Sequence, residues 1–393
     1  MKPKRLLILT ERFFPEEFLI NDLTSAWKER GWEIEVLTQT PSYPHDKVYE
    51  GYKNKLFQTT HELDNFPVHR VKTCLGYNTS VVRKILNYIN FAFLTTLWSL
   101  VNGWRYNRVF IYHTGPLTMA TAAIVLRFIC RKPTIIWTQD VWPDTVYAYG
   151  FKQTWWKAFL LNTFVSTIYA ACRTITVSSP SFVQKVARYT KRPVHFIPQW
   201  SPQTNCTPPS KPSNLKRIFT FAGNLGSVQN LEMLVDVFGE INPSNAELHL
   251  VGGGINLEPL RERVQQKGYH NIFLPGRKPQ AEMPELFAHS DVLIISLNEA
   301  FAMTLPAKFQ AYIAAGRPIF GIIGGDTADL IQTHALGIAC DPNPQALRTA
   351  FQRYLCESQE QLLVWGENAR KLSETTFDRN QIIHQMETLL TEA

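Results

Sequence analysis

The sequence predicts an α/β fold of two doubly wound domains, each built on a parallel sheet. Short β-branched or apolar runs alternate with segments long enough for a crossover helix, which is typical of parallel sheets. At residues 201–216 this alternation gives way to Pro, Ser and Asn, as expected of a linker, and it restarts afterwards. The 393 residues suffice for two cores, since a single core rarely grows past roughly 250 residues. We therefore expect domains over 1–200 and 217–372, followed by a terminal segment over 373–393.

The strands of the first domain are expected at Arg5–Thr10, Glu33–Thr38, Val68–Lys72, Val109–His113, Thr134–Thr138, Thr174–Ser178 and His195–Pro198. Those of the second are expected at Arg217–Ala222, Glu247–Val251, Ile272–Leu274, Asp291–Ser296, Pro318–Ile323 and Gly337–Cys340. Crossover helices fit between most of these strands, for example at Glu16–Arg30 and Leu117–Cys130. Residues 377–392 also have helical spacing. This last helix either stays solvated on the second domain or packs back on the first.

Two segments, 85–101 and 154–172, are unusually apolar. Each is too short, or too interrupted by Asn and Lys, to be a membrane span. Arg83 and Lys84 precede the first segment, and aromatic residues line both. This composition suits helices in a bilayer interface, so we expect peripheral membrane contact through residues 80–105, residues 154–172 or both. The alternative is that both helices are buried against the sheet.

Composition limits the partners and the compartment. The formal charge of +7 and the pI near 9.0 favour anionic partners such as nucleotides, sugar phosphates or phospholipid headgroups. The positive charge is diffuse, which disfavours nucleic acid as a partner. The six cysteines form no Cys-x-x-Cys pair or Cys/His cluster, so we expect no zinc site and a reducing cytoplasmic setting. The apolar run at the start is too short for a signal peptide and is better explained as the first strand.

Ligands of open α/β sheets bind beyond the carboxyl ends of the strands. In the first domain, His113 ends one expected strand, and Asp140 follows the next one beside Trp142. A carboxylate near aromatic rings suits recognition of sugar hydroxyls, whereas a lone histidine at a strand end can equally be structural. Asp144 is better explained as capping the next helix. The segment RFFPEEFLIND joins the first strand to its helix and either faces a cleft or, through Glu16 and Glu17, complements the amino end of that helix.

In the second domain, Gly223-Asn224-Leu225-Gly226 follows a strand and forms either a phosphate cradle or only a tight turn. The glycines at 252–254 allow close backbone approach or simply a flexible turn, and Arg277 lies at another strand exit. Pro306 suits the first position of a helix, and Lys308 follows it. Free N–H groups at this helix end together with a lysine are suited to binding a phosphate.

Several other chemistries lose support. The chain contains neither Gly-x-x-x-x-Gly-Lys-Ser/Thr nor Gly-x-Gly-x-x-Gly after a strand, which disfavours nucleoside-triphosphate hydrolysis and dinucleotide redox chemistry. No Asp-x-Asp pair at a strand end indicates a bound divalent metal.

The ordered motifs TQDVWPDT, FIPQW, FAGNLGSVQNLE and LPAKFQAYIAAGRPI resemble the retaining nucleotide-sugar glycosyltransferases of the GT-B fold, group one or family four. Within that family they resemble the branch that builds bacterial O-antigen and exopolysaccharide repeats. The resemblance spans essentially the whole chain. It implies two Rossmann-like domains facing a cleft, with the donor held mainly by the second domain and the acceptor by the first. It also implies that the terminal helix, 373–393, crosses back to the first domain.

The resemblance also implies roles for individual residues. Gly223, Asn224 and Gly226 would lie near the donor pyrophosphate and Arg277 near the nucleotide. Thr304, Leu305 and Lys308 would lie near the phosphates and the sugar. His113 and Asp140 would orient the sugars.

Three departures from the family pattern are visible. Asn224 and Gln229 stand where many relatives have an Arg and a Lys, so Lys308 and backbone N–H groups would carry more of the phosphate binding. Met303 and Ala311 stand where relatives have two glutamates, so the usual ribose-binding carboxylate is missing. The sequence PEEFLIND replaces a glycine-rich first loop.

The implied function is metal-independent, retaining transfer of a hexose or amino sugar from a nucleoside-diphosphate sugar to a lipid-linked or oligosaccharide acceptor, without a further cofactor. Lys308, Arg277 and the helix amino end would stabilise the departing phosphate. The expected location is the cytoplasm, peripherally at the inner face of the membrane. The alternatives are a nucleotide-sugar epimerase of the same fold and a non-catalytic sugar-nucleotide-binding member of an assembly complex.

Overall fold

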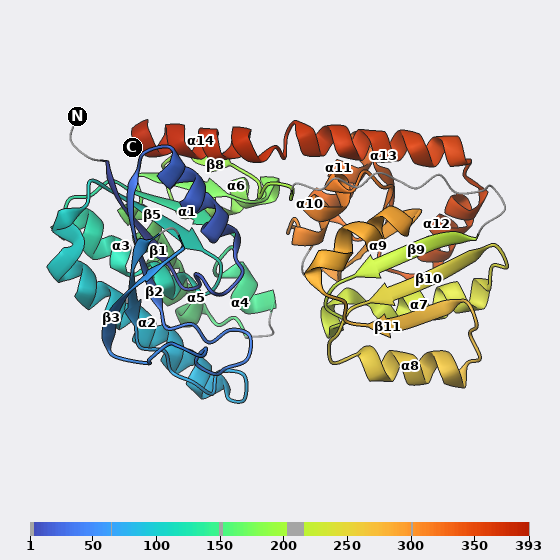
Figure 1. The fold of residues 1–393 in the computed structure, drawn as a ribbon, viewed down its shortest axis with the longest axis horizontal. Helices are drawn as coiled ribbons and strands as arrows, with labels where there is room; N and C mark the ends of the chain where they lie inside the picture. Colours follow the sequence, from blue (N-terminus) through green and yellow to red (C-terminus); the bar gives the residue numbers. More distant parts are fainter. Residues whose placement is uncertain (1–3, 64, 149–151, 203–215, 300–301, 393) are drawn as a thin grey trace. The chain divides into compact units, whose positions relative to one another are not determined.

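The computed structural model describes residues 4–63, 65–148, 152–202, 216–299 and 302–392 (Figure 1). The chain divides into two compact units, Met1–Pro198 with Asn380–Ala393, and Gln199–Arg379. Most of the expected linker at 201–216 lies outside the described residues. The two units are therefore described one at a time.

The first unit is built on a sheet with the strand order β3-β4-β2-β1-β5-β6-β7-β8. Its strands are β1 (Arg5–Thr10), β2 (Glu33–Gln39), β3 (Phe57–Glu62), β4 (Phe66–Val71), β5 (Arg108–His113), β6 (Thr134–Thr138), β7 (Thr174–Val177) and β8 (Val194–Phe196). All neighbouring pairs are parallel except β3 with β4. Each expected strand of this domain is present within a few residues.

Strand β3 was absent from the sequence prediction. Its sequence, FQTTHE, is mostly polar, and it lies at the edge of the sheet, where half of its residues are exposed. An ion pair of 2.6 Å between Glu62 on β3 and the buried Arg70 on β4 helps to hold it in place. Neither the edge position nor this pairing can be predicted from apolar periodicity.

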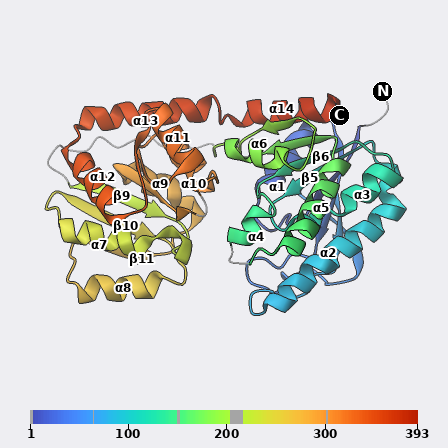
Figure 2. The same cartoon turned by 180° about the vertical axis from the view of Figure 1, so that it is seen from behind.

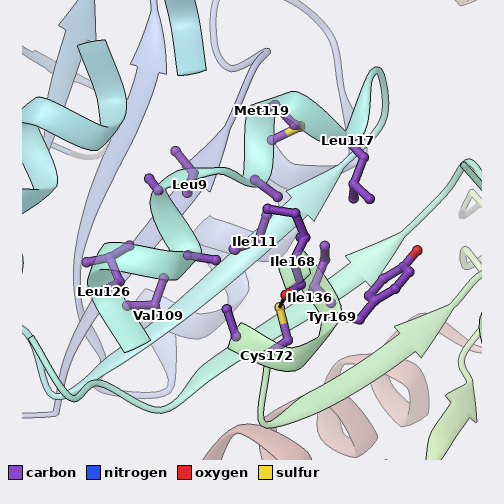
Figure 3. Packing of buried hydrophobic residues seen from close by; sticks show 14 of the residues in the cluster. Leu9, Val109, Ile111, Leu117, Met119, Leu126, Ile136, Ile168, Tyr169 and Cys172 are labelled. Atoms are coloured by element: carbon purple, nitrogen blue, oxygen red, sulfur yellow. Dashed lines mark hydrogen bonds between the residues drawn. The ribbon is translucent and has the colours of Figure 1, made fainter. Parts of the chain in front are cut away.

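The helices of the first unit are α1 (Leu19–Glu29), α2 (Val81–Asn102), α3 (Ala122–Ile124), α4 (Asp144–Ala148), α5 (Trp155–Ala171), α6 (Pro180–Ala187) and α14 (Arg379–Glu392). The helices α2, α3 and α5 form one layer on the sheet (Figure 2), and Leu9, Ile111, Ile136 and Ile168 pack in its core (Figure 3). Trp27 of α1 packs on Phe110 from the opposite face, with ring centroids 4.9 Å apart.

The crossover expected at Leu117–Cys130 is not one continuous α-helix. It consists of a 3₁₀ turn, η2 (Leu117–Ala120), the short α3, and a π-helical segment, η3 (Val125–Ile129).

The terminal helix α14 packs on the first unit. Glu387 accepts hydrogen bonds from Arg30 (3.0 Å) and from the indole of Trp32 (2.9 Å), and Ile383 and Leu390 are buried. This confirms the helix that the family resemblance implied, and the alternative of a solvated helix on the second domain is wrong.

The second unit contains a parallel sheet with the order β11-β10-β9-β12-β13-β14. Its strands are β9 (Arg217–Ala222), β10 (Ala246–Val251), β11 (Ile272–Gly276), β12 (Val292–Ser296), β13 (Ile319–Ile322) and β14 (Gly337–Cys340). Its helices are α7 (Leu231–Ile241), α8 (Leu257–Gln266), α9 (Met283–His289), α10 (Ala307–Ala314), α11 (Gly325–Thr333), α12 (Pro344–Cys356) and α13 (Gln359–Glu374). This is the Rossmann-like strand order, and the predicted fold class is confirmed.

Candidate functional site

Each sheet has a topological switch point, where the strand order reverses and where ligands of this fold bind. In the second unit it lies between β9 and β12, and in the first unit between β1 and β5. The residues that follow these strands are therefore the candidates for chemistry.

The loop after β9 lies against the loop after β10. The N–H of Gly223 donates to the carbonyl of Val251, and that of Leu225 to Gly253, both at 2.8 Å. A Cβ atom at Gly252 would lie only 1.8 Å from the carbonyl oxygen of Gly223, and Gly252 has a φ of +154°. The glycines at 252–254 therefore allow a close backbone approach and do not form merely a flexible turn.

Lys308 lies in the first turn of α10 and reaches this loop. Its Nζ is 3.4 Å from the ring centroid of Phe221, and a Cβ at Gly223 would be 2.5 Å from the Lys308 Cε. Among the described residues no carboxylate forms a salt bridge with it. Burial lowers the pKa of Lys308 to about 7. The structure therefore brings Gly223 and Lys308 together, although they are far apart in the sequence.

Gln229 supports the loop instead of facing a ligand. It is buried, and its side-chain oxygen accepts the Gly226 N–H at 3.0 Å. The N–H groups of Gly223, Leu225 and Gly226 are thus all hydrogen-bonded within the protein. The expectation that this loop supplies backbone donors therefore fails for these three groups, and the side chain of Lys308 occupies the space above Gly223.

The other residues predicted to bind the donor include Arg277, Thr304 and Leu305. Arg277 is exposed after β11, and its Cβ is 3.8 Å from a Cβ built at Gly253. The carbonyl of Thr304 accepts the Thr327 hydroxyl at 3.2 Å, and the Leu305 side chain is buried.

In the first unit, His113 and Asp140 occupy adjacent strand ends. The N–H of Gln139 donates to the His113 carbonyl at 2.8 Å, so the loop that carries Asp140 starts beside His113. His113 is fully buried, and neither ring nitrogen makes a hydrogen bond of normal geometry with any residue in the described ranges. Burial lowers its pKa to about 4, against a smaller opposing effect of the Gly115 backbone, and burial raises the pKa of Asp140 to about 6. The imidazole is therefore neutral near pH 7, while Asp140 is mostly ionised.

Glu11 is a candidate site residue that the sequence analysis did not include. It follows β1 directly, is buried, and lies at the switch point, where a Cβ at Gly115 would be 2.8 Å from its Oε2. Arg12 contacts its other oxygen at 3.4 Å, and Gln39 donates to that oxygen at 3.3 Å. Burial raises the pKa of Glu11 despite Arg12. Its place immediately after a buried strand, the criterion that identified His113 and Asp140, would have revealed it.

The interpretation of Glu16 as a partner of the helix end is wrong. Helix α1 begins at Leu19, and the buried Glu16 accepts the N–H groups of Ser42 and Tyr43 at 2.9 and 2.7 Å. It also pairs with Arg12 at 3.3 Å. Glu16 therefore fixes the loop after β2.

Asp144 is the first residue of α4 and forms an ion pair with Lys185, which agrees with a structural role. Among the described residues, no group of three His, Cys, Asp or Glu side chains could hold a metal ion. None of the helices within the described ranges has the length and apolar character needed to cross a bilayer.

Comparisons with known proteins match each unit to a family of glycosyltransferase domains. Residues 19–200 match the family described as "Glycosyl transferase 4-like domain", and residues 207–372 match "Glycosyl transferases group 1". The chain is 23% identical to WbjE of Pseudomonas aeruginosa, named as a glycosyltransferase, over 68% of this chain and 70% of WbjE. It is also 23% identical to WcaI of Escherichia coli K12, named as a colanic acid biosynthesis glycosyl transferase, over 97% of this chain and 98% of WcaI.

Among solved structures, HepE of Anabaena in complex with UDP-glucose superposes with a TM-score of 0.69 at 13% identity, covering 99% of this chain and 100% of HepE. The fold and the two family matches define a two-domain sugar-transferring enzyme. The chain is a glycosyltransferase of the GT-B fold.

Proposed function

We propose that the protein is a retaining, metal-independent transferase. It moves a hexose or amino sugar from a nucleoside-diphosphate sugar to a lipid-linked or oligosaccharide acceptor during assembly of a bacterial surface polysaccharide or exopolysaccharide. The observation that carries this proposal is Lys308, a half-buried cation without a salt bridge among the described residues, at the switch point of the second sheet.

Lys308 suits a phosphate for a physical reason. Partial burial disfavours its charged form, and a phosphate beside it would restore that form. The first turn of α10 adds N–H groups, and Arg277 adds a second cation at a neighbouring strand exit. HepE, which shares the fold, binds UDP-glucose, which supports a sugar nucleotide as the ligand.

The transfer proposed here breaks the bond between the anomeric carbon and the donor's phosphate oxygen. The acceptor oxygen forms its bond on the same face, and the acceptor's proton passes to the leaving phosphate oxygen. Lys308 and Arg277 stabilise the negative charge that develops on the diphosphate. In the first unit, the neutral His113 and the carboxylate of Asp140 hold hydroxyl groups of the sugars.

The family resemblance implies a ribose-binding glutamate that this chain does not have. Met303 and Ala311 occupy the positions where the family resemblance places glutamates, so no carboxylate at Ala311 can accept the ribose hydroxyls. We propose that donor affinity rests mainly on the phosphates. This departure also favours the second candidate function, a member that binds a sugar nucleotide without transferring it.

A thermal-shift screen against nucleoside diphosphates and their sugars tests donor binding, because a ligand of the folded state raises Tm. At a hundredfold excess over Kd the expected stabilisation is about 2.7 kcal/mol. Positive donors are then incubated alone and with lipid extracts. Transfer only with the extract supports the proposal, and an altered free sugar nucleotide without acceptor supports an epimerase. Binding without any reaction supports the non-catalytic function.

The acceptor and the location are part of the same proposal. A lipid-linked acceptor is presented at a membrane surface, so we propose that the protein works in the cytoplasm, peripherally at the inner face of the membrane.

A further inference from the structure

Helix α2 exposes its most apolar face. Its large apolar side chains recur every three or four residues along one exposed stripe, Val82, Leu86, Ile89, Phe93, Leu97, Leu100 and Trp104, the last just beyond the helix end. The Phe93 side chain is 65% exposed. A helix that only covered a sheet would show the opposite pattern, with polar residues facing water.

The inner face of the same helix is partly polar. Asn87, Thr95 and Ser99 are buried on it. The side-chain amide oxygen of Asn87 accepts the N–H of Cys74 at 2.9 Å, and the Thr95 hydroxyl donates to the backbone carbonyl of Phe91 at 2.7 Å. The exposed stripe therefore cannot be explained as a misplaced core face, because the inward face is buried and two of its polar side chains, Asn87 and Thr95, are hydrogen-bonded.

Two further segments of the same layer also expose large apolar side chains. The amino-terminal half of α5 exposes Trp155, Trp156, Phe159 and Leu160, whereas the buried residues of this helix, Val165, Ile168, Tyr169 and Ala171, all lie in its other half. Phe128 and Ile129 of η3 are exposed as well. Since α3 contacts both α2 and α5, and η3 contacts α2, these segments belong to one helical layer (Figure 2). We call the outer surface of α2, η3 and the first half of α5 the apolar face.

The charge of these segments has a single sign. No Asp or Glu occurs in the sequence between Asp64 and Asp140, nor between Asp144 and Glu232. The segments that form the apolar face instead carry Arg83, Lys84, Arg127 and Lys157, of which all but Arg127 are exposed. Exposed aliphatic and aromatic groups with basic and no acidic residues are complementary to an anionic lipid surface.

We propose that the apolar face docks on an anionic lipid bilayer, with the α2 stripe and the tryptophans of α5 inserted at the headgroup level and the basic residues at the phosphates. This deepens the proposed function at its lipid-linked acceptor. It rests on the exposure and charge of α2 and α5, and its test requires neither donor nor transfer.

The test is sedimentation of the full chain with vesicles. Wild-type protein is expected to sediment with phosphatidylcholine vesicles that contain phosphatidylglycerol, less with phosphatidylcholine alone, and less at high salt, because salt screens the lipid charge. Leu86→Glu/Phe93→Glu is expected to weaken binding to the anionic vesicles at least about thirtyfold, since each charge near such a surface changes affinity about fivefold.

Leu363→Glu is the matched control. Leu363 on α13 of the second unit is 52% exposed, and Leu86 is 51% exposed. This control is expected to sediment like the wild type. Thermal unfolding of every variant verifies that the chain is folded.

Arg83→Ala/Lys157→Ala, one cation from each helix, is expected to reduce binding at low salt and to leave the residual binding at high salt unchanged.

Three results would overturn the inference. The first is wild-type protein that stays in the supernatant with anionic vesicles, and the second is equal binding by the Leu86→Glu/Phe93→Glu variant. The third concerns a different occupant: a dimer seen by analytical ultracentrifugation without lipid, which Leu86→Glu dissociates, would assign the apolar face to a second copy. Sedimentation that is retained while every sugar-transfer assay fails would overturn the proposed function alone.

Discussion

The two switch points differ in how they treat buried charge. In the first unit, Arg12 lies between two carboxylates, Glu11 and Glu16, and each of these accepts further hydrogen bonds. In the second unit, Lys308 has an aromatic ring and a glycine as neighbours, and no salt bridge within the described residues. Removing a cation from a buried ion pair destabilises the fold, because the carboxylates are left uncompensated, whereas a cation kept without such a partner is suited to an anionic ligand. Removing Lys308 should therefore lower activity and leave stability nearly unchanged, whereas removing Arg12 should lower stability.

The largest expected effect is on activity. Lys308→Ala should lower sugar transfer by about 10²–10³-fold, the usual loss when one charge-stabilising group is removed. It should leave Tm unchanged or slightly higher, because a partly desolvated charge is removed. Turnover is measured with the donor found in the thermal-shift screen, and Lys278→Ala, an exposed lysine, serves as control. Near wild-type turnover of Lys308→Ala would exclude the donor site described here.

The next effect is on stability. Arg12→Gln should lower the free energy of unfolding by about 3 kcal/mol, because it leaves two buried carboxylates without their cation. Arg5→Gln, which breaks an exposed pair with Glu33, should change it by less than about 1 kcal/mol. Denaturant titration compares the two variants, and equal effects would contradict the difference drawn between the switch points.

A glycine pair tests the packing of the donor loop. Gly252→Ala should destabilise the second unit by about 3 kcal/mol, because its Cβ meets the Gly223 carbonyl and cannot be accommodated without moving that loop. Gly268 also has a positive φ, but no atom lies within 4 Å of a Cβ built there. Gly268→Ala should therefore show only the backbone strain of about 1–2 kcal/mol. A smaller loss for Gly252→Ala than for Gly268→Ala would mean that the two loops separate easily.

The smallest expected effect is the change of donor affinity with pH. Lys308 has a pKa of about 7 in the free protein, and a bound diphosphate favours its protonated form. Below pH 7 the lysine is already charged, so Lys308 should add no pH dependence to the affinity for UDP-glucose there. Above pH 7 binding must take up a proton, and Kd should rise by at most about tenfold per pH unit. Calorimetry at several pH values measures this. Lys308→Met should bind more weakly and without this slope, and a slope that persists in Lys308→Met would assign it to another group.

Much of the architecture could be predicted from local pattern. Strands such as Arg217–Ala222 and Thr134–Thr138 were placed to the residue, because buried parallel strands are short continuous apolar runs bounded by turn residues. The edge strand β3 was missed because it is polar and is held by Arg70. The crossover after Leu117 was predicted as one helix, but its break into 3₁₀, α and π segments has no signal in apolar spacing.

The sequence by itself determined the α/β class, the positions of most strands, and the residues at the strand ends, since period and turn chemistry are local properties. It also determined which functional side chains the protein has, and that the charged residues of the α2 and α5 segments are all basic. Only the tertiary structure decided that Lys308 lies against Gly223, that Gln229 faces inward, that Glu11 joins the first switch point, and that α2 exposes its apolar face. Those outcomes depend on strand order and on which side of a helix packs, and both are set by contacts between residues far apart in the chain.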